Sequence, residues 1–208
     1  MALDLVIENG TVIDGSGGPR YRADVGVKAG RIVEIGRIRG SATERIDAEG
    51  HIVSPGFIDG HTHMDAQVAW DQLGSCSCWH GVTSVVMGNC GFALAPCQPG
   101  EREWIARCLE AVEDIPVEAM MNGIDWTWET FPDYLDQVAQ LPKAINYSAF
   151  IGHSALRMYV MGQRALSEVA NEDDLRNMGA AVEEALQAGA VGLSTSRATT
   201  HITPEGSP

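Results

Sequence analysis

The amino-acid sequence predicts an α/β protein in which a small antiparallel β-unit precedes the first four β/α units of a TIM-type barrel. In residues 1–51, β-forming residues alternate around glycine-rich turns. From residue 52 onward, a short apolar strand and helical material alternate four times. This serial order predicts parallel strands with right-handed crossovers. We therefore expect two domains, 1–51 and 52–208.

The first 51 residues are expected to form two hairpins. The dipeptide Asn9-Gly10 lies between alternating β-formers, and both residues tolerate positive φ, which predicts the first hairpin. The segment 28–30, Lys-Ala-Gly, predicts the turn of the second. A unit of this size buries little surface, so we expect it to pack on the remainder of the chain.

The barrel part is expected to contain strands at 52–59, 84–88, 145–151 and 189–193. Helices are expected over 104–112, after Pro132 and after Asn171, the last ending at Gly189. One face of that last helix carries Leu175, Met178, Val182, Ala185 and Leu186. Eight such units would need about twice as many residues, so the sequence predicts half a barrel with unpaired strand edges. We expect a fragment of a longer enzyme, or one completed by another chain.

Composition restricts the class of partner. Lys and Arg total 14 against 28 Asp and Glu, giving a net charge of −14 that repels phosphate backbones and anionic lipids. Nucleic acid and membranes are therefore not expected partners. The start lacks the pattern of a secretory signal, and the five cysteines form an odd count, which favours reduced thiols in the cytoplasm.

The pair His61 and His63 is the first candidate site. Residues two apart on a strand point to the same side, so both imidazoles can face one metal ion at the end of the first barrel strand, where barrel enzymes have their active sites. The alternative is two unrelated surface histidines. Asp59 and Asp65 flank the pair and either orient the imidazoles or are ordinary acidic loop residues.

Cys90 lies at the corresponding end of the next strand, between Gly88 and Gly91. A thiolate there suits zinc, which accepts mixed sulfur and nitrogen ligands. The alternative is a buried, inert cysteine. Cys76 and Cys78 precede that strand and are interpreted as core or coincidence.

The third strand ends at His153, followed by Arg157. His153 is a candidate metal ligand, a donor to a substrate carbonyl, or a structural histidine. Arg157 is a candidate partner for a substrate carboxylate, or it caps the neighbouring loop. The hydroxyls of residues 194–196 end the fourth strand, although such residues are also common in turns. We assign no role to His51, His80 and His201.

The segment PGFIDGHTHMD at 55–65, preceded by the β-unit, resembles the amidohydrolase superfamily. Four further blocks resemble the N-acyl-D-amino-acid deacylases (D-aminoacylases) in their usual order: VMGNCG at 86–91, WETFPDYL at 128–135, GHSALR at 152–157 and GLSTSR at 192–197. Many amidohydrolases use a carboxylated lysine that the deacylases replace by cysteine. Lys28 and Lys143 end no predicted strand, whereas Cys90 stands at the expected place.

The resemblance implies a β-unit that is part of a β-sandwich, followed by a zinc-bearing barrel. It implies one tight Zn²⁺ held by Cys90 and two later histidines, and a second, weaker metal position at His61 and His63. The general-base aspartate is expected beyond residue 208, so no catalytic residue is expected in this chain, which alone should be inactive. The implied reaction converts an N-acyl-D-amino acid to a carboxylate and a D-amino acid, with His153 and Arg157 binding substrate.

Two other functions remain open at this stage. One is another amidohydrolase reaction, on a cyclic amide, ureide or dipeptide, because one barrel fold hosts many chemistries. The other is a truncated, non-catalytic chain. The sequence does not indicate the preferred acyl group, the D-side chain or the oligomeric state.

Overall fold

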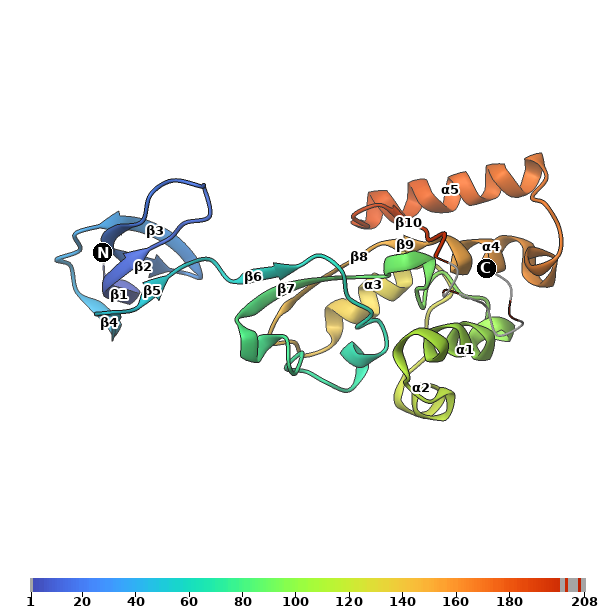
Figure 1. Cartoon of the computed structure of the whole chain (residues 1–208), viewed down its shortest axis with the longest axis horizontal. Coiled ribbons are helices and arrows are strands. Elements are labelled where there is room, and N and C mark those ends of the chain that lie inside the picture. Colours follow the sequence, from blue (N-terminus) through green and yellow to red (C-terminus); the bar gives the residue numbers. More distant parts are fainter. Residues whose placement is uncertain (1, 199–200, 202–205, 207–208) are drawn as a thin grey trace. The chain divides into compact units, whose positions relative to one another are not determined.

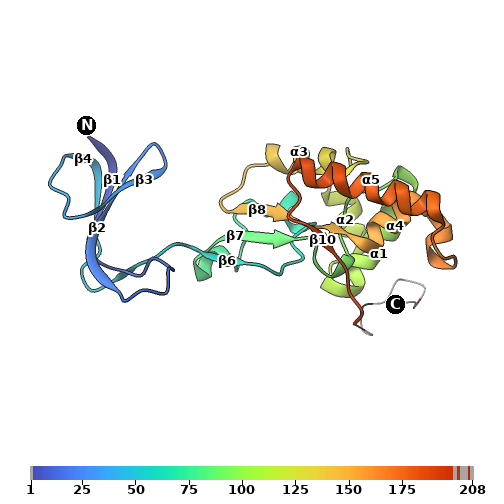
Figure 2. The same ribbon diagram turned by 90° about the horizontal axis from the view of Figure 1, so that it is seen from above.

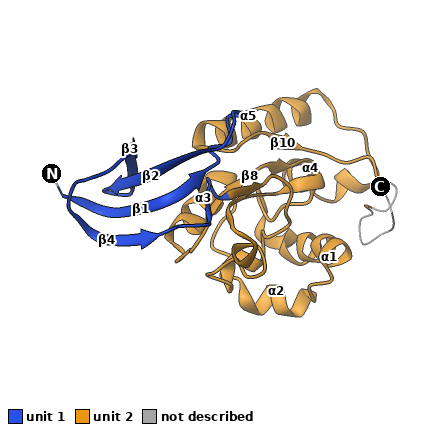
Figure 3. Cartoon of the chain, turned by 60° about the vertical axis from the view of Figure 1, so that its left-hand side comes forward, with its two compact units in different colours: residues 1–56 blue, residues 57–208 orange. Residues whose placement is uncertain are grey.

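The computed structural model describes residues 2–198, 201 and 206 and divides into two compact units, Met1–Gly56 and Phe57–Pro208 (Figure 3). The border follows Pro55-Gly56, a few residues beyond the border expected from the sequence. Among the described residues, no helix is long and apolar enough to cross a membrane.

The first unit is one five-stranded sheet built around its first strand. Strands β3, β2, β1 and β4 are neighbours in that order, and β5 also pairs with β1. Strands β4 and β5 run parallel to β1, so the expectation of a wholly antiparallel unit is wrong for these two. The bounds are β1 Leu3–Val12, β2 Tyr21–Lys28, β3 Arg31–Gly36, β4 Ala42–Asp47 and β5 Ile52–Val53.

The turn predicted at 28–30 is present, but Asn9-Gly10 forms no hairpin. Strand β1 continues through Asn9, whose φ of 62° belongs to a bulge in the pairing with β2. The carboxylate of Asp24 accepts the Asn9 backbone N–H at 3.0 Å, which satisfies a donor that the bulge removes from the ladder. A Cβ atom at Gly10 would lie 2.5 Å from Val53 Cγ2, so close packing also requires this glycine.

The second unit contains two sets of parallel strands. Figure 2 shows β6, β7 and β8 side by side, and β9 pairs with β10. The prediction of parallel pairing is confirmed. The strand expected at 52–59 is split by Pro55-Gly56. Near the strand expected at 189–193, only Leu193 and Ser194 form strand pairing. The bounds are β6 Phe57–Asp59, β7 Val82–Met87, β8 Asn146–Ala149, β9 Ile151–Gly152 and β10 Leu193–Ser194.

Five helices are described in the second unit, of which α2 and α4 were not predicted. Helix α5 packs beside α3 and α4, and α1 packs against α2 (Figure 1). Their apolar faces and the end of β7 enclose one large core that includes Met87, Leu109 and Phe131. The bounds are α1 Arg102–Glu113, α2 Val117–Gly123, α3 Phe131–Gln140, α4 His153–Met161 and α5 Glu172–Ala188.

Helix α5 begins and ends as predicted. The Asn171 side chain accepts hydrogen bonds from the backbone N–H groups of Asp173 and Asp174, and Gly189 ends the helix in the left-handed conformation. The expected apolar face is only partly correct: Met178 and Ala185 are buried, whereas Leu175 and Leu186 are 59% and 48% exposed. Asp174 is buried instead, because Arg164 pairs with its carboxylate at 2.6 Å.

Replacing Asn171 with Ala should destabilise the protein by about 1 kcal/mol, because two backbone donors of the first turn lose their acceptor. The measurement is the urea midpoint of unfolding. The control is Asn177→Ala in the middle of the same helix, where an exposed Asn→Ala change should be neutral or slightly stabilising. Equal losses in the two variants would contradict the capping role.

Candidate metal centre

The side chains of His61, His63 and Cys90 converge just beyond the carboxyl ends of two neighbouring strands. Their donor atoms all lie within 4.8 Å of one another, a group arranged to hold a metal ion in the described part of the chain. His61 Nε2 is 3.2 Å from Cys90 Sγ, and the two imidazole centroids are 5.5 Å apart. The sequence predicted that both motifs lie at the ends of neighbouring strands, and the structure brings their donors into one group.

The two ligand-bearing segments are joined through the backbone carbonyl of Val86 at the end of β7. This oxygen accepts hydrogen bonds from the Thr62 backbone N–H, the Thr62 hydroxyl and the Asn89 side-chain amide, at 2.9 to 3.0 Å. The Asn89 amide also donates to the Thr62 carbonyl. Because Thr62 lies between the two histidines and Asn89 precedes the cysteine, these bonds set the spacing of the donors.

The two aspartates flanking the histidines bind backbone rather than imidazole in the structure. Asp59 accepts the backbone N–H of His61 at 3.2 Å and fixes the turn that leaves β6. Asp65 is fully buried, and one of its oxygens accepts the Gly88 backbone N–H at 3.0 Å. Burial raises the pKa of the Asp65 carboxyl to about 7. The hydrogen bond between Asp65 and Gly88 is therefore a second connection, besides the Val86 carbonyl, between the histidine and cysteine segments.

Cys90 is held in an unusual backbone conformation, with φ of 59° and ψ of 11°. The Ser194 hydroxyl accepts the Gly91 backbone N–H at 3.0 Å and donates to the Gly88 carbonyl. The Ser194 side chain of β10 thus binds the backbone on both sides of Cys90. A Cβ atom at Gly88 would lie 2.2 Å from the Phe150 carbonyl oxygen, so this neighbour must be glycine.

The electrostatics of the group suit a cation. Burial, and then the neighbouring His61 and His201, lower the pKa of His63 to about 4, so its imidazole is neutral, as a metal ligand must be. Burial, and then Glu113, raise the pKa of the Cys90 thiol. A bound cation would reverse that shift by favouring the thiolate.

The donor set fits zinc. Two imidazole nitrogens and one thiolate sulfur are ligands that zinc accepts in tetrahedral sites, which leaves a fourth position for another group. Within the described residues, His63 Nδ1 is buried without a hydrogen-bond partner, as is one oxygen of Asp65. An unpaired buried carboxylate oxygen costs free energy, and a nearby cation would offset that cost for Asp65.

His153 follows β9 as the first residue of α4, beside the cysteine segment. A Cβ atom at Gly152 would lie 2.5 Å from the Gly91 carbonyl oxygen, so the two backbones are in close contact. His153 Nδ1 is 3.3 Å from the Thr195 hydroxyl. Burial, and then Arg157, lower the pKa of His153, which favours the neutral imidazole. The structure does not bring His153 into the group of metal donors.

Arg157 makes the contacts expected of its loop-capping alternative. Its guanidinium donates to the backbone carbonyls of Ala165 and Glu168 at 3.0 and 3.1 Å, which ties α4 to the segment that follows it. A role toward a substrate carboxylate stays a prediction.

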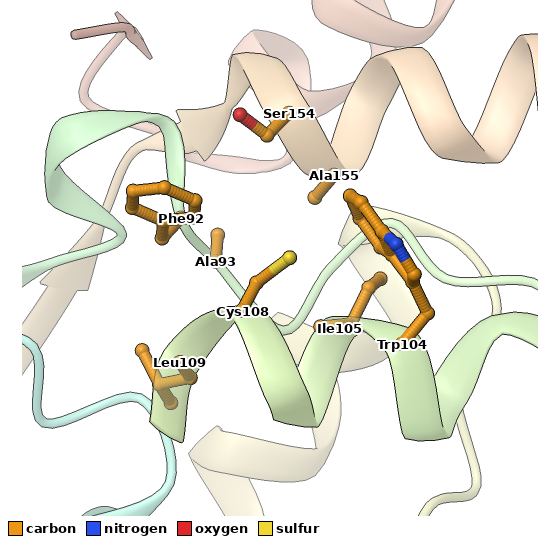
Figure 4. Close-up of a pocket in the computed structure, with 8 residues that line it drawn as sticks. All are labelled: Phe92, Ala93, Trp104, Ile105, Cys108, Leu109, Ser154 and Ala155. Atoms are coloured by element: carbon orange, nitrogen blue, oxygen red, sulfur yellow. The ribbon is translucent and has the colours of Figure 1, made fainter. Parts of the chain in front are cut away.

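A small cavity lies in the core between α1, α4 and the segment after Cys90. Figure 4 shows its lining side chains, which include Phe92, Trp104 and Ser154. Its volume is about 10 Å³, which is room for about one water molecule. This cavity is too small to be a substrate chamber.

Glu113 is a residue near the candidate site that sequence reasoning missed. Its Oε1 lies 4.0 Å from His63 Nε2, although it is 50 residues further along the chain. The glutamate ends α1, and no motif marks it, so only the packing of that helix reveals the contact. His201 is also nearby: its ring lies 5.7 Å from that of Phe92, and its Nδ1 contacts the Ser196 hydroxyl.

Comparison with known proteins agrees with this geometry. A family model described as the amidohydrolase family matches residues 44–207. The chain belongs to the amidohydrolase family. Residues 1–56 also match the N-terminal domain of the urease alpha-subunit.

Several amidohydrolase relatives are deacylases. The chain is 38% identical to a D-aminoacylase and 43% identical to an N-acyl-D-glutamate deacylase, both of Alcaligenes xylosoxydans xylosoxydans, over 92% and 93% of its length. It spans 37% of the length of each. A crystal structure of D-aminoacylase superposes with a TM-score of 0.77 at 37% identity, covering 93% of this chain and 38% of that one.

A second solved structure is a Bordetella bronchiseptica N-acyl-D-glutamate deacylase with zinc and a phosphonate inhibitor. It superposes with a TM-score of 0.75 at 34% identity, covering 94% of this chain and 38% of that one. The amidohydrolase fold assignment therefore rests on sequence and structure together.

Two cysteines of the amidohydrolase chain should differ sharply in reactivity. Burial raises the pKa of Cys97 to about 12, so its thiol stays protonated between pH 7 and 9, whereas Cys76 is exposed. Iodoacetamide should label Cys76 in the native protein and Cys97 only after unfolding, as read by peptide mass mapping. Native labelling of Cys97 that increases from pH 7 to 9 would contradict the assigned environment.

Ser194→Ala should loosen the segment around Cys90, because the buried Gly91 N–H loses its acceptor, at a cost of about 1–3 kcal/mol. Cys90 should then be alkylated faster than in the parent protein. Ser148→Ala is the matched control, since that hydroxyl donates to the Val85 carbonyl and does not touch the cysteine segment. If both variants change Cys90 alkylation equally, Ser194 has no specific role there.

Proposed function

We propose that the complete polypeptide carrying these residues is a zinc-dependent hydrolase that cleaves the amide bond of N-acyl-D-amino acids. The observation that carries the proposal is the convergence of His61, His63 and Cys90 at the ends of β6 and β7, in a chain most of which aligns with deacylases. The products are a carboxylate and a D-amino acid.

The proposed architecture is a β-sandwich domain and a (β/α)₈ barrel, to which this chain contributes the first part of each. The parallel order of β6, β7 and β8 supports the barrel. The chain spans 37% of its curated relatives, so the further strands, later metal ligands and general-base aspartate belong to the rest of such a polypeptide.

We assign metal binding in this chain to His61, His63 and Cys90. In the complete protein, Cys90 contributes to a tight zinc position with later histidines, and the two histidines form a second, weaker one. A bound zinc ion supplies Lewis-acid chemistry to the scissile carbonyl. A relative complexed with zinc and a phosphonate inhibitor supports zinc as the metal.

His153 is proposed to bind the acyl carbonyl of the substrate. The Thr195 hydroxyl lies 3.3 Å from Nδ1. In the tautomer in which Thr195 donates to Nδ1, the Nε2–H of the neutral imidazole is available to donate to a carbonyl oxygen. The lowered pKa of His153 supports the neutral form at neutral pH.

Arg157 is proposed to bind the substrate α-carboxylate with the part of its guanidinium that the backbone carbonyls leave available. The Michaelis constant of Arg157→Ala should then rise more than its turnover number falls. If the turnover number falls with an unchanged Michaelis constant, Arg157 only supports the loop.

The complete polypeptide should release acetate from N-acetyl-D-amino acids and leave the L-enantiomers intact. Cys90→Ala should reduce kcat/KM by about 100-fold or more, because the metal loses its sulfur ligand. The Cys76→Ala variant is the matched control and should retain activity, since that thiol lies outside the metal group. Hydrolysis of cyclic imides, ureides or dipeptides, without hydrolysis of N-acyl-D-amino acids, would contradict the proposed substrate class.

A further inference from the structure

The surroundings of Glu113 disfavour the negative charge of its carboxylate. It ends α1, where the helix dipole is negative, and Asp114 follows it directly. The side chain is 31% exposed, so water screens it only in part. Three unfavourable effects therefore act on one carboxylate: the helix end, a neighbouring like charge and partial burial.

No lysine or arginine in the described part of the chain forms an ion pair with Glu113. Over residues 2–198, 201 and 206, the ion pair formed by Glu113 is the one with His63. A divalent cation beside His63 would compensate all three effects at once.

The distance between Glu113 and His63 is suited to a shared ion. Two ligands of a tetrahedral zinc ion are roughly 3.4 Å apart, given bonds of about 2.0–2.1 Å. Glu113 Oε1 is 4.0 Å from His63 Nε2 but lies outside the group whose donors are all within 4.8 Å of one another, so its side chain must move to reach the same ion. Two imidazoles, a thiolate and this carboxylate would complete four donors.

We propose that Glu113 is a further metal ligand of this chain, supplying an oxygen donor to the ion held by His61, His63 and Cys90. This inference rests on the metal binding proposed above. It explains why α1 ends in an acidic residue that faces the histidines.

The test compares Glu113→Gln with Asp114→Asn in the full 208-residue chain, with Zn²⁺ titrated into chelator-treated protein and thermal unfolding recorded with and without the ion. Asp114→Asn is the matched control, because it removes the same charge one residue further along, at a position whose backbone φ of 54° Asn tolerates. Gln preserves the shape of Glu but binds zinc weakly.

We expect Glu113→Gln to weaken Zn²⁺ binding by about 10- to 100-fold, and Asp114→Asn by less than about threefold. We expect Glu113→Gln to raise the Tm of the metal-free protein by about 1–4 °C, because it removes an unfavourable charge, and to reduce the Tm gain on adding zinc. A purely structural glutamate would instead lower the Tm in both states.

Two results would overturn the inference in different ways. If zinc raises the Tm of the parent chain but binds Glu113→Gln within about threefold as tightly, Glu113 is no ligand and the proposed metal centre stands. If zinc neither binds the parent chain in the titration nor changes its Tm, the metal centre and the inference both fail.

Discussion

The carbonyl oxygen of Val86 is the acceptor on which the geometry of the site depends. It receives three hydrogen bonds, two from Thr62 and one from Asn89, and a carbonyl has only two lone pairs. Because these donors lie between the two histidines and next to the cysteine, the bonds join the ends of β6 and β7. The metal donors are thereby placed by backbone structure before any ion binds, which reduces the ordering cost of binding.

The same region holds two carboxyl groups, of Asp65 and Glu113, with which no lysine or arginine of the described residues forms an ion pair. Asp65 is buried with one oxygen unpaired within the described residues, and Glu113 faces His63 from a helix end that disfavours it. The whole sequence carries a net charge of −14, so the long-range field also favours a cation. A divalent cation is the simplest compensating charge, and the nearby imidazole and thiol groups select its chemistry.

The parts of the fold with strong local signals could be predicted from the sequence. Asn171 and Gly189 mark both ends of α5 because capping and left-handed backbone depend on residue type. His61, His63 and Cys90 were found because strand ends place residues predictably. The hairpin predicted at Asn9-Gly10 was wrong because the positive φ that suits a hairpin turn also suits a bulge. The bulge is favoured by Asp24, 15 residues away, which accepts the Asn9 backbone N–H.

Tertiary contacts account for the rest. Leu175 satisfies the helical period but is exposed, since Arg164 draws Asp174 inward on the same helix. Ser194 supports Cys90 from 104 positions further along the chain, and nothing in its local sequence distinguishes it from a turn residue. Glu113 likewise reaches His63 only through the packing of α1. Such positions carry no period or motif, so sequence reasoning alone does not reach them.

The central claim is that, in this 208-residue chain without the later histidines, one metal ion is held by the imidazoles of His61 and His63 and the Cys90 thiolate. Zinc K-edge X-ray absorption of the zinc-loaded chain tests it most directly. We predict one sulfur neighbour at about 2.3 Å with nitrogen or oxygen neighbours at about 2.0–2.1 Å, and loss of the sulfur in Cys90→Ser. A shell of nitrogen and oxygen alone in the parent chain would contradict it.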